Sequence, residues 1–294
     1  QQRSSAASDV YKRQVIDGVY ESSEDYTLIL GEQQATGTIE NVDIPLVSVS
    51  ENVSVSEGSA AEFTVSLSKN TAEAVTINLA LAHLETDASD ISSMVVEYHD
   101  GNSWQTLAIA PNGDVILPAG VTQARVSVQT SDDDSQPVYE GAERFELAVS
   151  GVAGAQGSDS IVATIVDDGS VDPDGEGPEI ADDDRPVVTS VSDQNVEEGG
   201  VVSFDVALSA KSTSDTQVVL ELNEINATSP EDFNGSVVTV KYGDPEQSEQ
   251  VTLQNGAFEF DLPAGESDFT VSVQTNDDQA VSYTHLRAHE TYTY

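Results

Sequence analysis

One sequence pattern occurs twice at a fixed spacing, and this repetition constrains the fold more than any other feature. The tetrapeptide Leu-Pro-Ala-Gly at 117–120 returns at 262–265, which is 145 residues later. The pentapeptide Val-Ser-Val-Gln-Thr at 126–130 returns at 271–275, again 145 residues later. Repetition over this length predicts tandem copies of one domain, each with its own core, within the 294 residues.

Further recurring residues show where the copies begin and end. Glu57-Gly58 returns as Glu198-Gly199, and the Tyr-Glu of 20–21 returns at 139–140. The chain is therefore predicted to hold the tail of one repeat, a complete repeat and the front of a third. The predicted segments are a non-native tail at 1–14, the C-terminal strands of a truncated first repeat at 15–44, a complete β-sandwich at 45–168, an acidic linker at 169–185, a C-terminally truncated repeat at 186–280 and a non-native tail at 281–294.

The two predicted tails resemble translated sequencing-adapter strings that recur at the ends of metagenomic fragments. They contain four of the ten basic residues, so we exclude them from fold reasoning. His285 and His289 are four residues apart and could ligate a metal from one helix face, but the artefact interpretation is favoured.

Within each repeat, apolar and polar residues alternate with a period of two. Phe63, Val65 and Leu67 alternate with polar residues, and the third repeat has the same pattern in 204–208. This alternation predicts strands with one face on a core and one face in water. Short strands separated by Gly, Asn, Asp and Pro turns predict an all-β fold of tandem immunoglobulin-like antiparallel β-sandwiches.

Composition excludes several classes of function. Asp and Glu number 53 against 10 Lys and Arg, and the formal net charge of −43 disfavours nucleic acid and anionic membrane surfaces. The absence of cysteine excludes disulfides and zinc-thiolate sites. No run approaches the ~18 apolar residues of a membrane span, and no signal peptide is visible. We expect a secreted protein.

The acidic residues are clustered at predicted strand ends. The stretch 130–146 holds Asp132, Asp133, Asp134, Glu140 and Glu143, and only one arginine accompanies them. Turns at alternate strand ends converge at one pole of a sandwich, where so many carboxylates would repel one another without a cation. Ca²⁺ takes six to eight oxygen ligands in flexible geometry. A calcium site is predicted; the alternative is a solvated acidic pole, as in salt-adapted proteins.

Three short segments of the sequence resemble a known family of repeats. The residues Tyr-Thr-Leu-Ile-Leu at 26–30, Thr-Gly-Thr-Ile-Glu-Asn at 36–41 and Pro-Val-Val-Thr-Ser-Val-Ser at 186–192 resemble Calx-β repeats, especially those of very large, RTX-type bacterial surface adhesins. The resemblance covers about 15–280. It implies two to four calcium ions at one pole and these ligands: Glu57, Asp90, Asp132, Asp133, Glu140, Glu143, Asp167 and Asp168, with Glu198, Asp232, Asp277 and Asp278 in the third repeat.

The linker offers a second possibility for calcium. Asp172, Asp174, Glu176 and Gly177, with Asp183 at position twelve, partly match an EF-hand loop. The flanking helices are missing and two prolines interrupt the loop, so a semi-rigid acidic spacer is the favoured interpretation.

No catalytic set is visible, so we expect no enzyme. The leading hypothesis is a calcium-binding extender, or stalk, of a secreted bacterial adhesin, in which calcium rigidifies tandem repeats for cell adhesion and biofilm attachment. The adhesin resemblance implies type I secretion to the cell surface. The expected partners are calcium ions, neighbouring repeats and a possible glycan or surface-protein target. The alternative is a calcium-dependent module that itself binds carbohydrate or protein.

Overall fold

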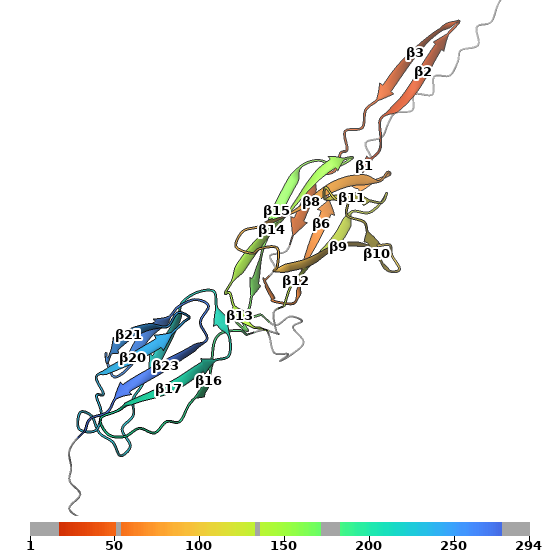
Figure 1. The fold of residues 1–294 in the computed structure, drawn as a ribbon. Coiled ribbons are helices and arrows are strands. Elements are labelled where there is room, and N and C mark those ends of the chain that lie inside the picture. Colours follow the sequence, from red (N-terminus) through yellow and green to blue (C-terminus); the bar gives the residue numbers. More distant parts are fainter. Residues whose placement is uncertain (1–17, 51–53, 133–135, 172–182, 278–294) are drawn as a thin grey trace, which may run out of the picture. The chain divides into compact units, whose positions relative to one another are not determined.

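The computed structural model describes residues 18–50, 54–132, 136–171 and 183–277 (Figure 1). The described residues form strands and turns, which confirms the all-β prediction. None of them forms a helix long and apolar enough to cross a membrane. Both predicted tails, the candidate ligands Asp133 and Asp278, and most of the linker lie outside the described residues.

Packing divides the chain into two compact units. The first comprises Gln1–Asp132, Ala142–Val166 and Ser170–Ala181, and the second comprises Asp133–Gly141, Asp167–Gly169 and Asp182–Tyr294. The predicted complete repeat at 45–168 is therefore divided differently. The short stretches Asp133–Gly141 and Asp167–Gly169 belong to the second unit, although the residues between them, Ala142–Val166, belong to the first.

The described residues of the first unit form fourteen strands. They are β1 (Val19–Tyr20), β2 (Glu24–Leu30), β3 (Gln33–Ile39), β4 (Val47–Ser50), β5 (Ser54–Ser56), β6 (Ala60–Leu67), β7 (Asn70–Thr71), β8 (Val75–His83), β9 (Ile91–His99), β10 (Trp104–Leu107), β11 (Asp114–Leu117), β12 (Gln123–Thr130), β14 (Glu143–Ala153) and β15 (Ser158–Val166).

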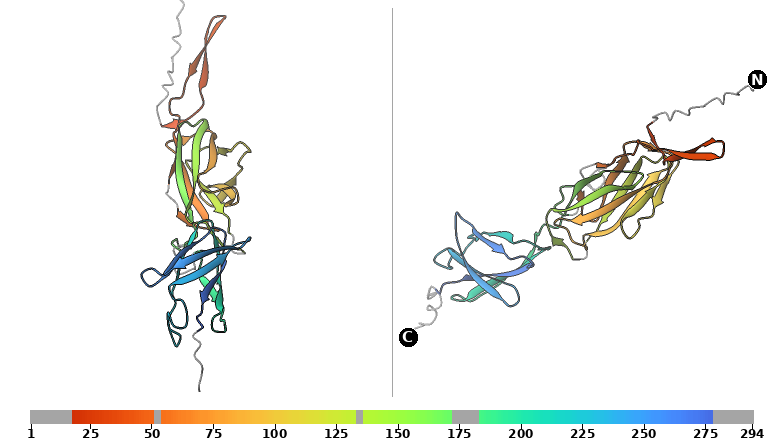
Figure 2. Two further views of the ribbon diagram at one scale, coloured as in Figure 1. Left: turned by 60° about the vertical axis from the view of Figure 1, so that its left-hand side comes forward. Right: turned by 90° about the horizontal axis from the view of Figure 1, so that it is seen from above.

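Most of these strands form two five-stranded sheets, with the orders β10-β9-β12-β6-β4 and β11-β8-β14-β15-β5 (Figures 1 and 2). The alternation seen in the sequence places Phe63, Val65 and Leu67 of β6 on the inner face of one sheet and Phe145 of β14 on the inner face of the other. These side chains are buried in one shared core. The rings of Phe63 and Phe145 meet edge to face, with centroids 6.1 Å apart. The two sheets therefore form the predicted sandwich, in which every strand pair is antiparallel among the described residues except that β5 pairs in parallel with β15.

The remaining strands of the first unit lie outside these two sheets. β1 pairs in parallel with β7, and β2 pairs with β3 as a two-stranded hairpin. Every residue of β2 is exposed. The alternating sequence of β2 therefore forms a strand in this structure without burying its apolar face.

In the second unit, nine strands are formed by the residues that the structure describes. They are β13 (Val138–Tyr139), β16 (Val188–Val191), β17 (Val201–Leu208), β18 (Lys211–Ser212), β19 (Thr216–Leu220), β20 (Val237–Tyr242), β21 (Gln247–Thr252), β22 (Phe258–Leu262) and β23 (Asp268–Gln274).

One sheet of the second unit has five strands, in the order β16-β17-β23-β20-β21, and faces a two-stranded sheet of β19 and β22. Their shared core includes Val240, Phe258, Leu262 and Val271. Phe260 and Phe269 pack edge to face, with centroids 5.3 Å apart. β13 pairs in parallel with β18, as β1 pairs with β7 in the first unit. Among the described residues, the second unit thus repeats the first five-stranded sheet of the first unit and, in β19 and β22, the β8–β11 pair of its other sheet.

Candidate metal centre

Three acidic turns of the first unit are joined by backbone hydrogen bonds at one pole of its sandwich. The amide of Gly58, in the turn after β5, donates to the carbonyl of Ser131 at 2.7 Å. The amide of Ser131, after β12, donates to the carbonyl of Asp90 at 2.8 Å. Glu57, Asp90 and Asp132 adjoin these bonded residues, so the fold gathers three of the predicted ligands at neighbouring positions.

Gly58 is required at this junction for two reasons. Its φ of +74° is in the left-handed region, which side-chain-bearing residues rarely adopt. A Cβ atom at this position would lie 3.0 Å from Oδ2 of Asp132. The glycine therefore allows the Asp132 carboxylate to lie directly against the turn that carries Glu57.

A fourth carboxylate comes from the first residue of β14. One carboxylate oxygen of Glu143 lies within 4.8 Å of one carboxylate oxygen of Asp90. Two oxygens that each lie about 2.4 Å from one Ca²⁺ ion are at most about twice that distance apart. Asp90 and Glu143 are therefore close enough to ligate one ion together, although carboxylates at this separation repel each other without a cation.

Local hydrogen bonds fix the loop that carries Asp90. The Asp87 amide donates to Oδ2 of Asp90, and Oδ1 of Asp87 accepts hydrogen bonds from the amide and hydroxyl of Ser89. These bonds from Ser89 hold the pKa of Asp87 below its ordinary value. Both carboxylates therefore contribute to loop geometry, and Asp87 remains ionised over a wide pH range.

Asp167 is the most deeply buried of the predicted ligands that the structure describes, with a relative exposure of 2%. Its Oδ2 accepts hydrogen bonds from the amides of Glu140 at 2.6 Å and Gly141 at 3.2 Å. Its Oδ1 is buried and has no hydrogen-bond partner among the described residues. A buried carboxylate oxygen of this kind is costly, and a bound cation would satisfy it.

Burial raises the pKa of Asp167, and the neighbouring charge of Asp168 raises it further. The folded protein therefore binds this proton more tightly than the unfolded chain does. The stability that protonation contributes is present below the ordinary pKa of the carboxyl group and is lost as the pH rises through the raised pKa. At neutral pH the charged form destabilises the fold unless a cation compensates it.

We expect Asp167→Asn to raise the melting temperature in chelator and to reduce the stabilisation by added calcium. Asparagine keeps an oxygen that can accept from the two amide donors, and it removes the buried charge. We estimate the free-energy cost of burying that charge without a partner at about 1–3 kcal/mol. The β2–β3 hairpin already has asparagine at the corresponding position. Glu24 lies opposite Ile39 as Glu143 lies opposite Ile165, so Asn41, two residues after Ile39, corresponds to Asp167, two residues after Ile165.

Thermal unfolding with and without calcium checks this expectation. The exposed Asp261→Asn is the control, because Asp261 lies on the outer face of β22 and its replacement should leave both transitions unchanged. A melting temperature in chelator that falls for Asp167→Asn would contradict the argument.

The second unit repeats the arrangement of the first pole. The Asn276 amide donates to the carbonyl of Asp232 at 2.8 Å, as Ser131 does to Asp90. A Cβ atom at Gly199, where φ is +80°, would lie 3.1 Å from Cβ of Asp277, as Gly58 meets Asp132. Glu198, Asp232 and Asp277 are therefore gathered at one pole as Glu57, Asp90 and Asp132 are.

The predicted ligands thus fall into three groups. The pole of the first unit holds Glu57, Asp90, Asp132 and Glu143; the stretches 136–141 and 167–169 of the second unit hold Glu140, Asp167 and Asp168; and the pole of the second unit holds Glu198, Asp232 and Asp277. That the first two groups form one joint site remains a prediction.

Asp43 and Asp183 are among the described carboxylates that pair with a basic residue. Asp43, near the end of the predicted first repeat, is buried and pairs with Lys69 at 2.5 Å. In the predicted linker, Arg185 contacts both carboxylate oxygens of Asp183 at 2.7 Å and lowers its pKa. The other residues of the predicted EF-hand-like loop lie outside the described residues.

Sequence reasoning missed the backbone groups that assemble the poles. The carbonyl of Asp90 and both backbone groups of Ser131 join the turns, yet no side-chain pattern marks them. The sequence signal for these contacts is indirect: the recurring Glu-Gly pair indicates a turn that only glycine can form.

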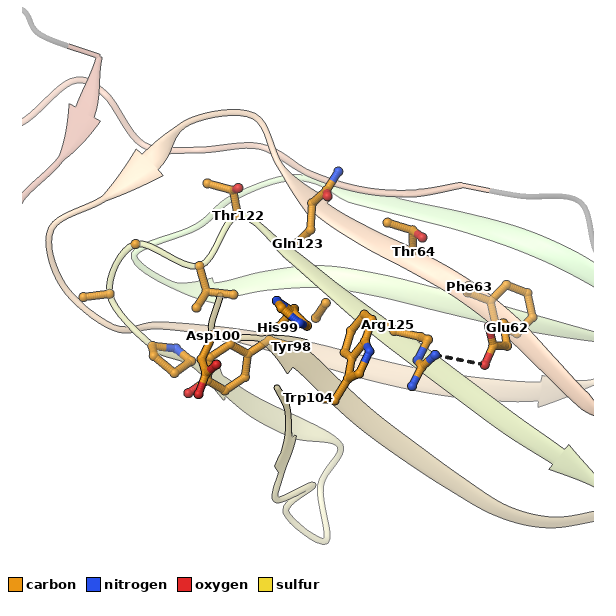
Figure 3. A pocket seen from close by; sticks show the side chains of 15 residues that line it. Glu62, Phe63, Thr64, Tyr98, His99, Asp100, Trp104, Thr122, Gln123 and Arg125 are labelled. Atoms are coloured by element: carbon orange, nitrogen blue, oxygen red, sulfur yellow. Dashed lines mark ion pairs between the residues drawn. The ribbon is translucent and has the colours of Figure 1, made fainter. Parts of the chain in front are cut away.

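A cavity of about 600 Å³ lies in the first unit, and its lining includes none of Glu57, Asp90, Asp132 and Glu143 (Figure 3). Its walls include Tyr98, His99 and Trp104, and Trp104 is 48% exposed. The guanidinium carbon of Arg125 lies 4.1 Å from the centroid of the Trp104 ring, and Arg125 also pairs with Glu62. The guanidinium group of Arg125 therefore covers one face of the Trp104 ring.

The fold and its acidic poles define a tandem immunoglobulin-like β-sandwich protein with candidate cation sites. The model of the Calx-beta domain family matches residues 40–169 and 182–288, so the chain belongs to the Calx-beta domain family. This family comprises calcium-binding, immunoglobulin-like, non-catalytic β-sandwich modules.

Other comparisons add little to this assignment. No curated protein sequence matches the chain significantly. Among solved structures, it is similar to one described as the crystal structure of the periplasmic chaperone SfaE. The similarity has 11% sequence identity and a TM-score of 0.29, and it covers 79% of this chain and 93% of that chain.

The residues present fit calcium. The donors at the first pole are carboxylate oxygens, which hard cations prefer, and Asp167 presents a buried carboxylate oxygen that has no hydrogen-bond partner in the described part of the chain. Asp90 and Glu143 would hold an ion in the first unit, with Glu57 and Asp132 adjacent to them. Bound calcium would supply positive charge that offsets carboxylate repulsion.

Proposed function

We propose that this chain is a calcium-binding extender segment of a secreted, RTX-type bacterial surface adhesin. The observation that carries the proposal is the repetition of one acidic pole: the hydrogen bonds and glycine contacts that gather Glu57, Asp90 and Asp132 are repeated around Glu198, Asp232 and Asp277. A protein with a single calcium site needs only one acidic pole. A stalk built from tandem repeats needs such a pole in each repeat, and both units have one.

The proposed mechanism is electrostatic. Without calcium, the carboxylates at each pole repel one another and the ends of the strands separate. With calcium outside the cell, the ions hold the turns together and stiffen each repeat and its neighbours. Secretion to the cell surface, cell adhesion and biofilm attachment complete the proposal, with neighbouring repeats and a surface target as partners.

Small-angle X-ray scattering tests the stalk. We expect the maximum dimension to become better defined and the flexibility of the chain to decrease when calcium replaces chelator. Magnesium at the same concentration is the control, because it keeps its waters and fits flexible carboxylate sites poorly. Identical scattering curves in calcium and chelator would contradict the proposal.

The aromatic cavity supports a second candidate, a calcium-dependent module that binds carbohydrate. The exposed part of Trp104 lies beside Tyr98 and His99, and such side chains line sugar sites. Asp100 lines the same cavity, but amide hydrogen bonds from Ser103 and Asn102 hold its pKa low, which does not suit a general acid. Glycan-array binding that disappears with Trp104→Ala and with chelator would favour this candidate over the stalk.

A further inference from the structure

In each unit, a segment from earlier in the chain docks on a short strand of the sandwich. β1 pairs in parallel with β7 in the first unit, and β13 pairs in parallel with β18 in the second. The amide of Ala72 donates to the carbonyl of Tyr20 at 2.8 Å, and the amide of Thr213 donates to the carbonyl of Tyr139 at 2.9 Å. Residues 18–21 and 138–141 are therefore equivalent docked segments.

Backbone contacts also fix which residues correspond at the start of each sandwich. The amide of Leu46 donates to Oγ of Ser68 at 2.8 Å, and the amide of Val187 donates to Oγ of Ser209 at 3.0 Å. Each serine amide donates in return to the carbonyl of its partner. Both pairs of counterparts are 141 residues apart, so a position in this part of the first unit corresponds to the position 141 residues later.

A lysine of the first unit balances a buried carboxylate beside the docked segment. Nζ of Lys69 lies 2.5 Å from Oδ1 of Asp43, whose relative exposure is 7%. The amide of Asp43 donates to Oδ1 of Asn41 at 2.6 Å, and Nδ2 of Asn41 donates to the carbonyl of Val19 at 3.5 Å. These contacts connect the lysine before β7 to the docked segment that contains β1.

The described residues of the second unit do not repeat this lysine contact. The counterpart of the lysine, 141 residues later, is Ala210, which carries no charge and is 4% exposed. The counterpart of Asn41 is Asp167, whose buried Oδ1 has no hydrogen-bond partner in the part of the chain that the structure describes. The guanidinium group of Arg185 contacts both oxygens of Asp183. The buried charge of Asp167 therefore lacks the balance that a lysine supplies in the first unit.

The sequence differences around the two docked segments all change the charge in one direction. Where the second unit has Asp167, Asp168 and Ala210, the first unit has Asn41, Val42 and Lys69. Two of these differences remove a negative charge, and the third adds a positive one. Because neighbouring carboxylates repel one another without a cation, the first unit needs a bound cation less than the second does.

We propose that the ammonium group of Lys69 does in the first unit what calcium does in the second. The first docked segment is then held without calcium, and only the second is released when calcium is removed. The chain thus combines a permanent contact with a calcium-dependent one of the same design. Calcium enters here only through the proposed function of the chain, whereas the role of Lys69 does not depend on it.

Amide hydrogen exchange of the full chain, measured well below its melting transitions, tests the contrast between the two units. The amides of Ala72 and Thr213 donate to the two docked segments and exchange faster when a segment leaves. In the natural chain, we expect chelator to lower the protection of the Thr213 amide roughly tenfold and to leave that of the Ala72 amide unchanged, because only local opening is affected.

Replacing Lys69 by methionine keeps the aliphatic stem and removes the charge. We expect the protection of the Ala72 amide in chelator to fall roughly tenfold, because Asp43 becomes a buried carboxylate without its partner. Adding Asp43→Asn should restore most of the protection, which a purely steric role of the lysine would not allow. The amide of Leu79, which donates to the carbonyl of Gly113, shows whether the sandwich remains folded.

The matched control is Lys241→Met, which breaks the exposed ion pair with Glu246 and should change neither amide. The proposal is overturned if the Ala72 amide keeps its protection in the Lys69→Met variant, or loses it in chelator in the natural chain. A Thr213 amide that does not respond to chelator overturns the contrast between the units and counts against calcium binding at Asp167. The comparison of Lys69→Met with its Asp43→Asn rescue, made in chelator, separates that failure from a failure of the lysine.

Discussion

Replacing Asp90 by asparagine and Glu143 by glutamine is expected to abolish most of the calcium-induced rise in the melting temperature of the first unit. These two carboxylates are the pair whose oxygens lie within 4.8 Å of each other at its pole. Neutral amides ligate calcium more weakly and repel each other less. The variant should therefore be no less stable than the natural chain in chelator, and less stable in calcium.

The size of this effect follows from binding linkage. Calcium at about a hundred times its dissociation constant stabilises a single site by about 2.7 kcal/mol, which corresponds to roughly 10 °C for a domain of this size. Differential scanning calorimetry with calcium and with chelator measures the loss. Glu32→Gln in the exposed turn of the hairpin, combined with Asp261→Asn on the exposed face of β22, is the charge-matched control. A full calcium response in the double variant would exclude Asp90 and Glu143 as ligands.

Truncation of Phe145 to alanine is expected to cause the largest loss of stability in the first unit. Phe145 is fully buried and packs edge to face on Phe63 across the two sheets. Removing a buried phenylalanine costs about 3–5 kcal/mol because the cavity collapses only partly. We expect the unfolding transition of the first unit to move to lower denaturant concentration, with the transition of the second unit unchanged.

The control for this variant is Ile116→Ala in the same unit. Ile116 lies on β11 and is exposed, so its truncation should change the free energy of unfolding by less than about 0.5 kcal/mol. Urea unfolding followed by circular dichroism compares the two variants. Similar losses for Phe145→Ala and Ile116→Ala would mean that the two sheets do not share the core described here.

Period-two alternation predicted which residues face the core wherever a complete sandwich formed around them. Phe63, Val65 and Leu67 are buried as their spacing predicts, because β6 lies inside a sheet that packs on another sheet. The same alternation in β2 predicted a strand correctly but could not predict its exposure. A strand buries its apolar face only when other strands cover it, and those strands are distant in the sequence.

For the site, the sequence predicted the residue types and their positions at strand ends, but not how they would group. Asp90 and Glu143 are 53 positions apart in the chain, and only the pairing of β8 with β14 brings their loops together. The carboxylate of Asp167 accepts hydrogen bonds from the amides of Glu140 and Gly141, and these backbone contacts have no side-chain signature in the sequence. The Calx-beta match supports calcium as the ion and leaves the ligand set as a prediction.

The sequence by itself determined the β-sandwich class, the repetition of the unit and the acidic character of its turns, because alternation, offsets and charge are properties of the chain order. Only the tertiary structure decided which carboxylates meet, that Asp43 is neutralised by Lys69 while Asp167 has no basic partner among the described residues, and that the apolar face of β2 is exposed. These outcomes depend on contacts between residues far apart in the chain, whose geometry is set by strand pairing and packing.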